Sequence, residues 1–168
     1  MKAGFSERNI TPAPGMEQPG DYGKGFNAGW VHDPCKVRAA VFDDEENRVA
    51  LVGVDVAMMP RYVAQTAREN ICRRCGIPPE SVLIAASHTH SGGPIGMVKP
   101  GEYDHASALV QQLAYEKSTC DDPGYATRVQ QAIADAVVEA DTRRSNALLG
   151  IGSGYEDQVA FNRRLRMR

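Results

Sequence analysis

Two nearly continuous apolar stretches, residues 48–56 and 81–87, stand out in the chain. Runs of this kind, without a polar residue at every second position, are typical of strands that are buried on both faces. Shorter β-rich stretches over 2–10 and 36–42 predict two more strands. The acidic residues 43–47 separate the runs on either side, which predicts a β-hairpin there.

Helical spacing of apolar residues predicts three helices, over residues 61–75, 104–117 and 123–142. Gly76 suits the C-terminal cap of the first helix, and Asp122 suits the N-terminal cap of the third. Because the first helix lies between the two apolar runs, we expect a crossover that leaves those strands parallel.

Two final strands are predicted over residues 147–151 and from 158 to the end. The fold class is therefore α/β, with a mixed, partly parallel sheet flanked by helices, in a single domain over 1–168. Polar and apolar residues still alternate in the last residues of the sequence, as they do in a half-buried strand. We therefore expect an incomplete, truncated domain. The irregular stretch 11–34 is rich in Gly and Pro and is expected to line a site.

Composition narrows the function classes. The chain is 42% hydrophobic and 24% charged, with a formal net charge of −2, so we expect no nucleic-acid partner. We also expect no membrane span and, since no signal peptide is visible, a cytoplasmic location. The last six residues contain four Arg, and a basic tail for RNA is the competing interpretation of that segment. Homo-oligomerisation is left open.

The most informative motif is the histidine pair in residues 86–94, Ala-Ser-His-Thr-His-Ser-Gly-Gly-Pro. His88 and His90 follow a predicted strand, and side chains two residues apart on extended backbone point to the same side. Two neutral imidazoles so placed can approach one zinc ion. The spacing alone leaves a metal site and a purely structural pair equally open.

The string Ser-His-Thr-His-Ser-Gly over 87–92 resembles the histidine signature of the neutral/alkaline, non-lysosomal ceramidase family. Three further stretches are similar to elements of that family in the same order. They are Asn-Ile-Thr-Pro over 9–12, His-Asp-Pro with a following Arg-Ala-Ala over 32–40, and Phe-Asn-Arg-Arg over 161–164. The sequence thus resembles the N-terminal portion of the family's catalytic domain.

This resemblance implies a zinc-dependent hydrolase of amide bonds, with an N-acyl, ceramide-like small-molecule or lipid substrate. It implies that His88 is a zinc ligand, that His90 lies beside the metal in the substrate pocket, and that Arg163 reaches the same pocket. In the family a second His, a Glu and a Tyr complete the zinc site. Those ligands have no matching motif in this sequence, so we expect the ligand set to be incomplete within it.

Several alternatives remain at this point. Asp55 ends its strand near His88 and is interpreted either as a partner that orients a histidine or as a capping carboxylate. The protein as a whole is interpreted either as the hydrolase, as a different metal hydrolase with a His-x-His pair, or as a catalytically silent binding or oligomerisation domain of the same fold. Ceramide and other N-acyl compounds are not distinguished.

Overall fold

The computed structural model describes residues 1–20, 26–160 and 164, and within them one mixed sheet of five strands forms the centre. The order across the sheet is β4-β3-β2-β1-β5. The strands are β1 Lys2–Asn9, β2 Lys36–Asp43, β3 Arg48–Val54, β4 Val82–Ala86 and β5 Ser145–Asn146.

The strand pairing confirms the predicted fold class. β1 and β2 are antiparallel, β2 and β3 form the expected hairpin, and β3 and β4 are parallel. The crossover between β3 and β4 is α1 (Arg61–Cys75), as the strand–helix–strand order requires.

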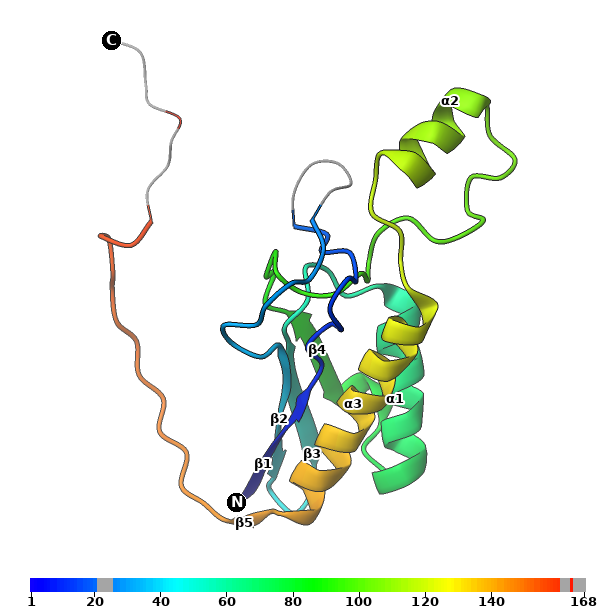
Figure 1. Cartoon of the computed structure of the whole chain (residues 1–168). Coiled ribbons are helices and arrows are strands. Elements are labelled where there is room, and N and C mark those ends of the chain that lie inside the picture. The colour runs from blue at the N-terminus through cyan, green and yellow to red at the C-terminus, as the bar shows by residue number, and fades with distance from the viewer. Residues whose placement is uncertain (21–25, 161–163, 165–168) are drawn as a thin grey trace.

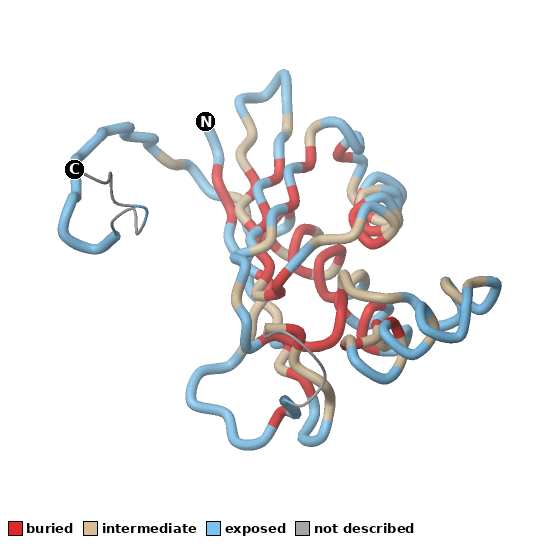
Figure 2. Tube along the Cα trace, turned by 90° about the horizontal axis from the view of Figure 1, so that it is seen from above, coloured by how far each residue is buried: buried red, intermediate tan, exposed pale blue. Residues whose placement is uncertain are grey.

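One face of the sheet is covered by α1 and by α3 (Pro123–Thr142) (Figure 1). The two helices pack against each other, and α3 packs across β1 and β2. Figure 2 shows the buried residues gathered between the sheet and these helices. This core contains inward-pointing strand residues and one stripe of each helix, among them Val37, Val41, Val52, Val54, Ile71, Val129 and Ile133.

Both long helices have the predicted bounds because local chemistry marks their ends. Pro60 precedes α1, and Gly76 ends it in the left-handed conformation, with φ 74°, which costs glycine little. The carboxylate of Asp122 caps α3 by accepting a hydrogen bond from the Tyr125 amide at 2.7 Å.

The prediction that the apolar strands are buried on both faces is wrong for the structure described. Val52 is 2% exposed, whereas its neighbour Leu51 is 46% exposed and Leu83 in β4 is 59% exposed. Successive strand residues point to opposite faces, and the helices cover only one face. The other side chains therefore point away from the core.

The predicted helix over 104–117 is much shorter than expected. Turns continue to residue 106, α2 spans only Ala108–Gln111, and a π-helical turn follows over Gln112–Glu116. The Gln111 side chain bonds to the carbonyls of Asp104 and Ala106, which holds the preceding chain in turns. Residues 98–120 form an arm that projects from the body (Figure 1).

The base of this arm is anchored by a buried carboxylate. Asp121 accepts hydrogen bonds from the Met97 amide at 2.6 Å and from the Tyr62 hydroxyl of α1 at 3.1 Å. The amine of Lys99 lies 4.2 Å above the centre of the Tyr62 ring, which is cation–π geometry. Burial is the main cause that raises the pKa of both Asp121 and Tyr62.

The predicted strand over 147–151 is also wrong. The last strand is β5, whose Asn146 pairs with Lys2 at the start of β1. The Ala147 amide still donates to the Met1 carbonyl at 3.1 Å, so the following residues have run past the edge strand. The described residues after 157 are not in a strand, and the rest of the second predicted strand lies outside the described residues.

None of the helices in the described ranges is long and apolar enough to cross a membrane. The four cysteines, Cys35, Cys72, Cys75 and Cys120, are free thiols.

Candidate metal and active site

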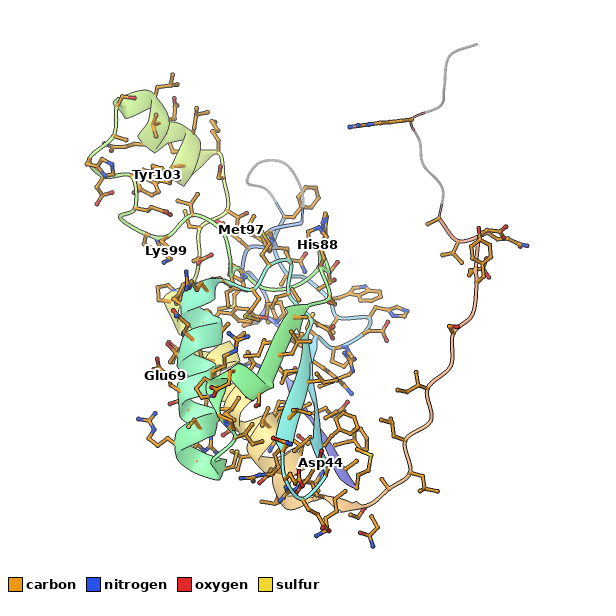
Figure 3. The ribbon with its side chains drawn as sticks, turned by 180° about the vertical axis from the view of Figure 1, so that it is seen from behind. Asp44, Glu69, His88, Met97, Lys99 and Tyr103 are labelled. Atoms are coloured by element: carbon orange, nitrogen blue, oxygen red, sulfur yellow. The ribbon has the colours of Figure 1, made fainter. Side chains whose placement is uncertain are left out.

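The histidine motif lies at the carboxyl end of the parallel strand pair. The Ser87 amide donates to the Val54 carbonyl at 2.9 Å, and this bond is the last that ties the β4 chain to β3. His88 then turns the chain away with φ 61°. A left-handed residue other than glycine costs about 1–3 kcal/mol and is concentrated at functional sites. Figure 3 shows His88 at the opposite end of the sheet from Asp44 in the β2–β3 turn.

A backbone carbonyl sets the tautomer of His88. The Nδ1 atom lies 2.7 Å from the carbonyl oxygen of Ala57, which can only accept, so Nδ1 carries the hydrogen. In the neutral ring, Nε2 is then left with its lone pair available. Metal-binding histidines commonly donate their other ring nitrogen to a carbonyl in this way.

The two histidines converge through their Nε2 atoms, which are 3.5 Å apart. Their rings are nearly perpendicular, with an interplanar angle of 85° and centroids 5.0 Å apart. Two nitrogens bound at 2.0–2.1 Å to one tetrahedral zinc would be separated by about 3.4 Å. The His88–His90 pair therefore fits the space beside a zinc ion, whether His90 is a second ligand or a neighbour of the metal.

The loop that carries the histidines is held by close contacts at its glycines. A Cβ on Gly93 would lie 2.4 Å from the ring of Tyr125, and a Cβ on Gly20 would lie 2.1 Å from the His90 carbonyl. Only glycine allows these approaches.

Tyr125 of α3 anchors the loop that carries the histidines. Its hydroxyl donates to the Ile10 carbonyl at 2.7 Å and accepts from the Gly93 amide. Burial raises the pKa of Tyr125 to about 12, so the hydroxyl stays neutral and can keep both bonds. In the sequence, Tyr125 only continues the apolar helical spacing of residues 123–142. Its hydroxyl gives no signal there, because its partners are backbone groups distant in sequence.

The Asp55 carboxylate forms its hydrogen bonds with groups other than a histidine. Its carboxylate accepts hydrogen bonds from the Lys36 amide and from Arg38, both at 2.9 Å. Burial raises the pKa of Asp55, but these two hydrogen bonds outweigh burial and keep that pKa below its ordinary value of 3.8. The structure therefore favours the capping interpretation, and the group that orients His88 is the Ala57 carbonyl.

A cavity of about 530 Å³ opens beside the histidine loop. The irregular stretch 11–34 forms much of its wall, as expected. Its lining also includes Thr89 and Ser91, which alternate with the two histidines, and the Arg38–Asp55 ion pair. The remaining wall residues are Thr11, Pro12, Gln18, Ala28, Trp30, Val31, His32, Asp33, Pro34 and Cys35.

The lining of this cavity combines an aromatic wall with charged groups. The Trp30 and His32 rings stack with centroids 5.6 Å apart, and His32 Nδ1 lies 2.7 Å from the Asp33 carboxylate. Burial raises the pKa of the Cys35 thiol, which keeps it protonated. The cavity thus offers apolar surface and hydrogen-bonding groups next to the histidines.

The structure brings together some of the expected site residues and leaves others out. His88 and His90 meet, and Asp55 lies on the wall of the adjacent cavity. Arg163 lies outside the described residues. Within the described ranges, no group of three or more His, Cys, Asp or Glu side chains is placed to hold a metal ion.

Comparison with known proteins supports the fold. No family model and no curated protein matches the sequence. The neutral ceramidase from Pseudomonas aeruginosa superposes on 85% of this chain and 22% of its own, with a TM-score of 0.58 and 20% identity. A structure described as a ceramidase complexed with C2 gives a TM-score of 0.57, 19% identity, and coverage of 85% and 21%.

The fold is therefore ceramidase-like, of a kind found in a hydrolase. The chain spans about a fifth of the length of these solved proteins.

Proposed function

We propose that this chain provides the N-terminal part of a zinc-dependent hydrolase that cleaves the amide bond of N-acyl, ceramide-like compounds. The observation that carries this proposal is the convergence of His88 and His90 at the end of β4, with 3.5 Å between their Nε2 atoms. The ceramidase-like fold supports the proposal, because two solved ceramidases superpose on most of this chain.

The proposed roles of His88 and His90 rest on their geometry, and that of Arg163 rests on the resemblance of residues 161–164 to the ceramidase family. His88 would hold zinc through Nε2, because its Nδ1–H is committed to the Ala57 carbonyl. When bound, zinc would supply a Lewis acid and lower the pKa of a water molecule toward neutrality. His90 would donate a hydrogen bond from Nε2 to the amide oxygen, or carry a proton there. Arg163 would hold a substrate oxygen through its guanidinium group.

The remaining zinc ligands are proposed to come from outside this sequence. A catalytic zinc usually has three protein ligands and one exchangeable position, and His88 supplies only one of the family's set. The ceramidases with the same fold are about five times as long as the part matched here, so there is ample chain to supply the others.

The cavity next to the histidine loop supports an amide substrate with an apolar portion. Trp30 and Val31 give its wall an apolar part, whereas Arg38 and the polar side chains beside it can accept hydrogen-bonding head groups. We assign the substrate to N-acyl compounds in general, of lipid or small-molecule type.

The test uses the complete polypeptide that contains this sequence. Zinc content is measured by elemental mass spectrometry, and hydrolysis is followed with a fluorescent N-acyl sphingosine and a fluorescent N-acyl amino acid. We expect His88→Ala to lose zinc and more than about 100-fold in kcat/KM. We expect His90→Ala to keep zinc but lose about 100- to 10,000-fold in kcat, which is the range for a general acid or base.

His105→Ala is the matched control, because His105 is exposed on the arm, away from the site. Unchanged zinc content and turnover in His88→Ala would contradict the proposal. A wild-type protein that neither binds zinc nor hydrolyses either compound would favour a binding domain of the same fold.

A further inference from the structure

One face of the sheet is not covered by any helix of the described residues, and the side chains on it are apolar like those of a core. The register places Phe5, Ala40, Leu51 and Leu83 in one row across four strands, and Phe42 and Val49 in the next row. We call these two rows the open face. The Phe5 and Phe42 rings meet edge to face, with centroids 6.2 Å apart.

The sequences of β3 and β4 suit strands that are buried on both faces. Apolar residues occupy the open face as well as the helix-covered face of both strands, a pattern found in strands between two layers. A sheet stabilises itself by packing each apolar face against another element. The exposure of Leu51 and Leu83 therefore marks a place for a second layer.

A second unpacked apolar element lies on the same side of the molecule. Residues 147–160, here called the tail segment, follow β5 in extended form and run past the side of the sheet away from α1 and α3 (Figures 1 and 2). Ile151 is 92% exposed. The other large apolar residues exposed in the tail segment are Leu148, Leu149, Tyr155 and Val159.

The tail segment begins next to the open face. Asn146 pairs with Lys2, one position from the row that joins Ala3 to Phe42 and Val49. The chain leaves β5 toward Met1, since Ser145 pairs with Ala3, Asn146 with Lys2, and the Ala147 amide bonds to Met1. Once the tail segment turns back along the sheet, the two apolar rows are the nearest part of this side, and the charged row that joins Glu7 to Arg38 lies beyond them. An extended chain advances about 3.3 Å per residue, so residues 147–160 are long enough to cross the whole sheet.

We propose that the tail segment folds back onto the open face and packs Leu148, Leu149, Ile151 and Tyr155 against it as part of a second layer. The occupant is this chain's own segment because it is tethered at the edge of the same sheet. Its effective concentration at the open face is consequently far higher than that of any free partner.

Disulfide trapping in the complete polypeptide that contains this sequence tests this proposal. In a background without other cysteines, Leu51→Cys is combined with Tyr155→Cys. The matched control combines Glu69→Cys with Tyr155→Cys, because Glu69 is exposed on α1, across the molecule (Figure 3). Leu83→Cys with Tyr155→Cys is a second open-face pair. The four positions changed to Cys are exposed, so these changes are expected to leave the fold intact. Circular dichroism checks that the variants fold.

We expect both open-face pairs to oxidise at least about 10-fold faster than the control pair, at a rate independent of protein concentration. Equal rates for the open-face and control pairs would overturn the proposal, because the tail segment would then not favour the open face. Cross-links that form only between molecules, at a rate rising with concentration, would also overturn it and assign the open face to a second copy of the chain.

Discussion

The two faces of the sheet contain similar residues but have different surroundings. Val52 and Leu51 are neighbours in β3, yet the first is buried in the core and the second is open to solvent. The same contrast separates Ile84 from Leu83 in β4. Hydrophobicity at a position therefore shows that it can be buried, whereas the neighbouring element decides whether it is buried.

The two faces of the sheet also differ in what they contribute: one mainly to stability, the other to the surroundings of the candidate site. The helix-covered face contains the described core and holds the histidine loop through Tyr125. On the uncovered side of the sheet, the open face is followed by the charged row of Glu7 and Arg38, and Arg38 lines the cavity beside the histidines. Changes on the covered face should therefore affect folding most, and changes on the other face should have smaller effects.

The largest effect is expected for Ile133→Ala in α3. Ile133 is fully buried in the core, and removing its side chain should lower the free energy of unfolding by about 2–5 kcal/mol. Urea unfolding followed by circular dichroism measures this change. Gln131→Ala, exposed on the same helix, is the control and should change stability by less than about 0.5 kcal/mol. Equal costs would mean that α3 does not pack on this face.

An intermediate loss in the free energy of unfolding is expected for Tyr125→Phe. The change removes the hydroxyl that donates to the Ile10 carbonyl and should cost about 1–3 kcal/mol, because it leaves buried backbone groups unpaired. Gly93→Ala should be destabilising for a different reason, since its Cβ would lie 2.4 Å from the Tyr125 ring. Both are measured by urea unfolding. If Tyr125→Phe costs under about 0.5 kcal/mol, the hydroxyl does not anchor the loop.

The smallest effect is expected for Asp55→Asn, and it depends on pH. The folded-state pKa of Asp55 is held below its ordinary value of 3.8, so ionised Asp55 stabilises the fold above that value. This contribution is lost as pH falls through the folded-state pKa. Because the ion pair with Arg38 is partly exposed, we expect less than about 1 kcal/mol.

Urea unfolding at a series of pH values checks this prediction. The stability difference between wild type and Asp55→Asn should be greatest above about pH 4 and should shrink in more acidic solution. Asp157→Asn, at an exposed position, is the control and should follow the wild type throughout. A difference that grows on acidification would show that the sign of the Asp55 contribution is wrong.

Most of the fold could be predicted where local signals and packing agree. The bounds 61–75 and 123–142 were correct because a proline precedes or opens each helix, a glycine follows one, and each has a continuous apolar stripe. The helix over 104–117 was predicted too long, because the Gln111 side chain bonds to the carbonyls of Asp104 and Ala106 and favours turns before residue 108. The strand over 147–151 was wrong because a strand also needs a partner, and the chain there has passed the end of β1.

The site was predictable only in part for a similar reason. The side chains of His88 and His90 meet, as the spacing predicted, but not on the extended backbone that the prediction assumed, because His88 has φ 61°. The positive φ of His88 and the donation from its Nδ1 to Ala57 depend on a neighbouring strand end, and no local pattern encodes them. Asp55 illustrates the same limit, since its strand-end position fitted two roles, and the proximity of Arg38 and the Lys36 amide distinguishes them.

By itself, the sequence determined the fold class, the order of the main elements and the histidine pair at a strand end. These features depend on periodicity, caps and spacing, which act within about one turn or one strand. Only the tertiary structure decided which face of each strand is buried, which group orients His88, and that Tyr125 holds the loop. Those outcomes depend on contacts between segments far apart in the chain, whose free energies exist only once the layers have packed.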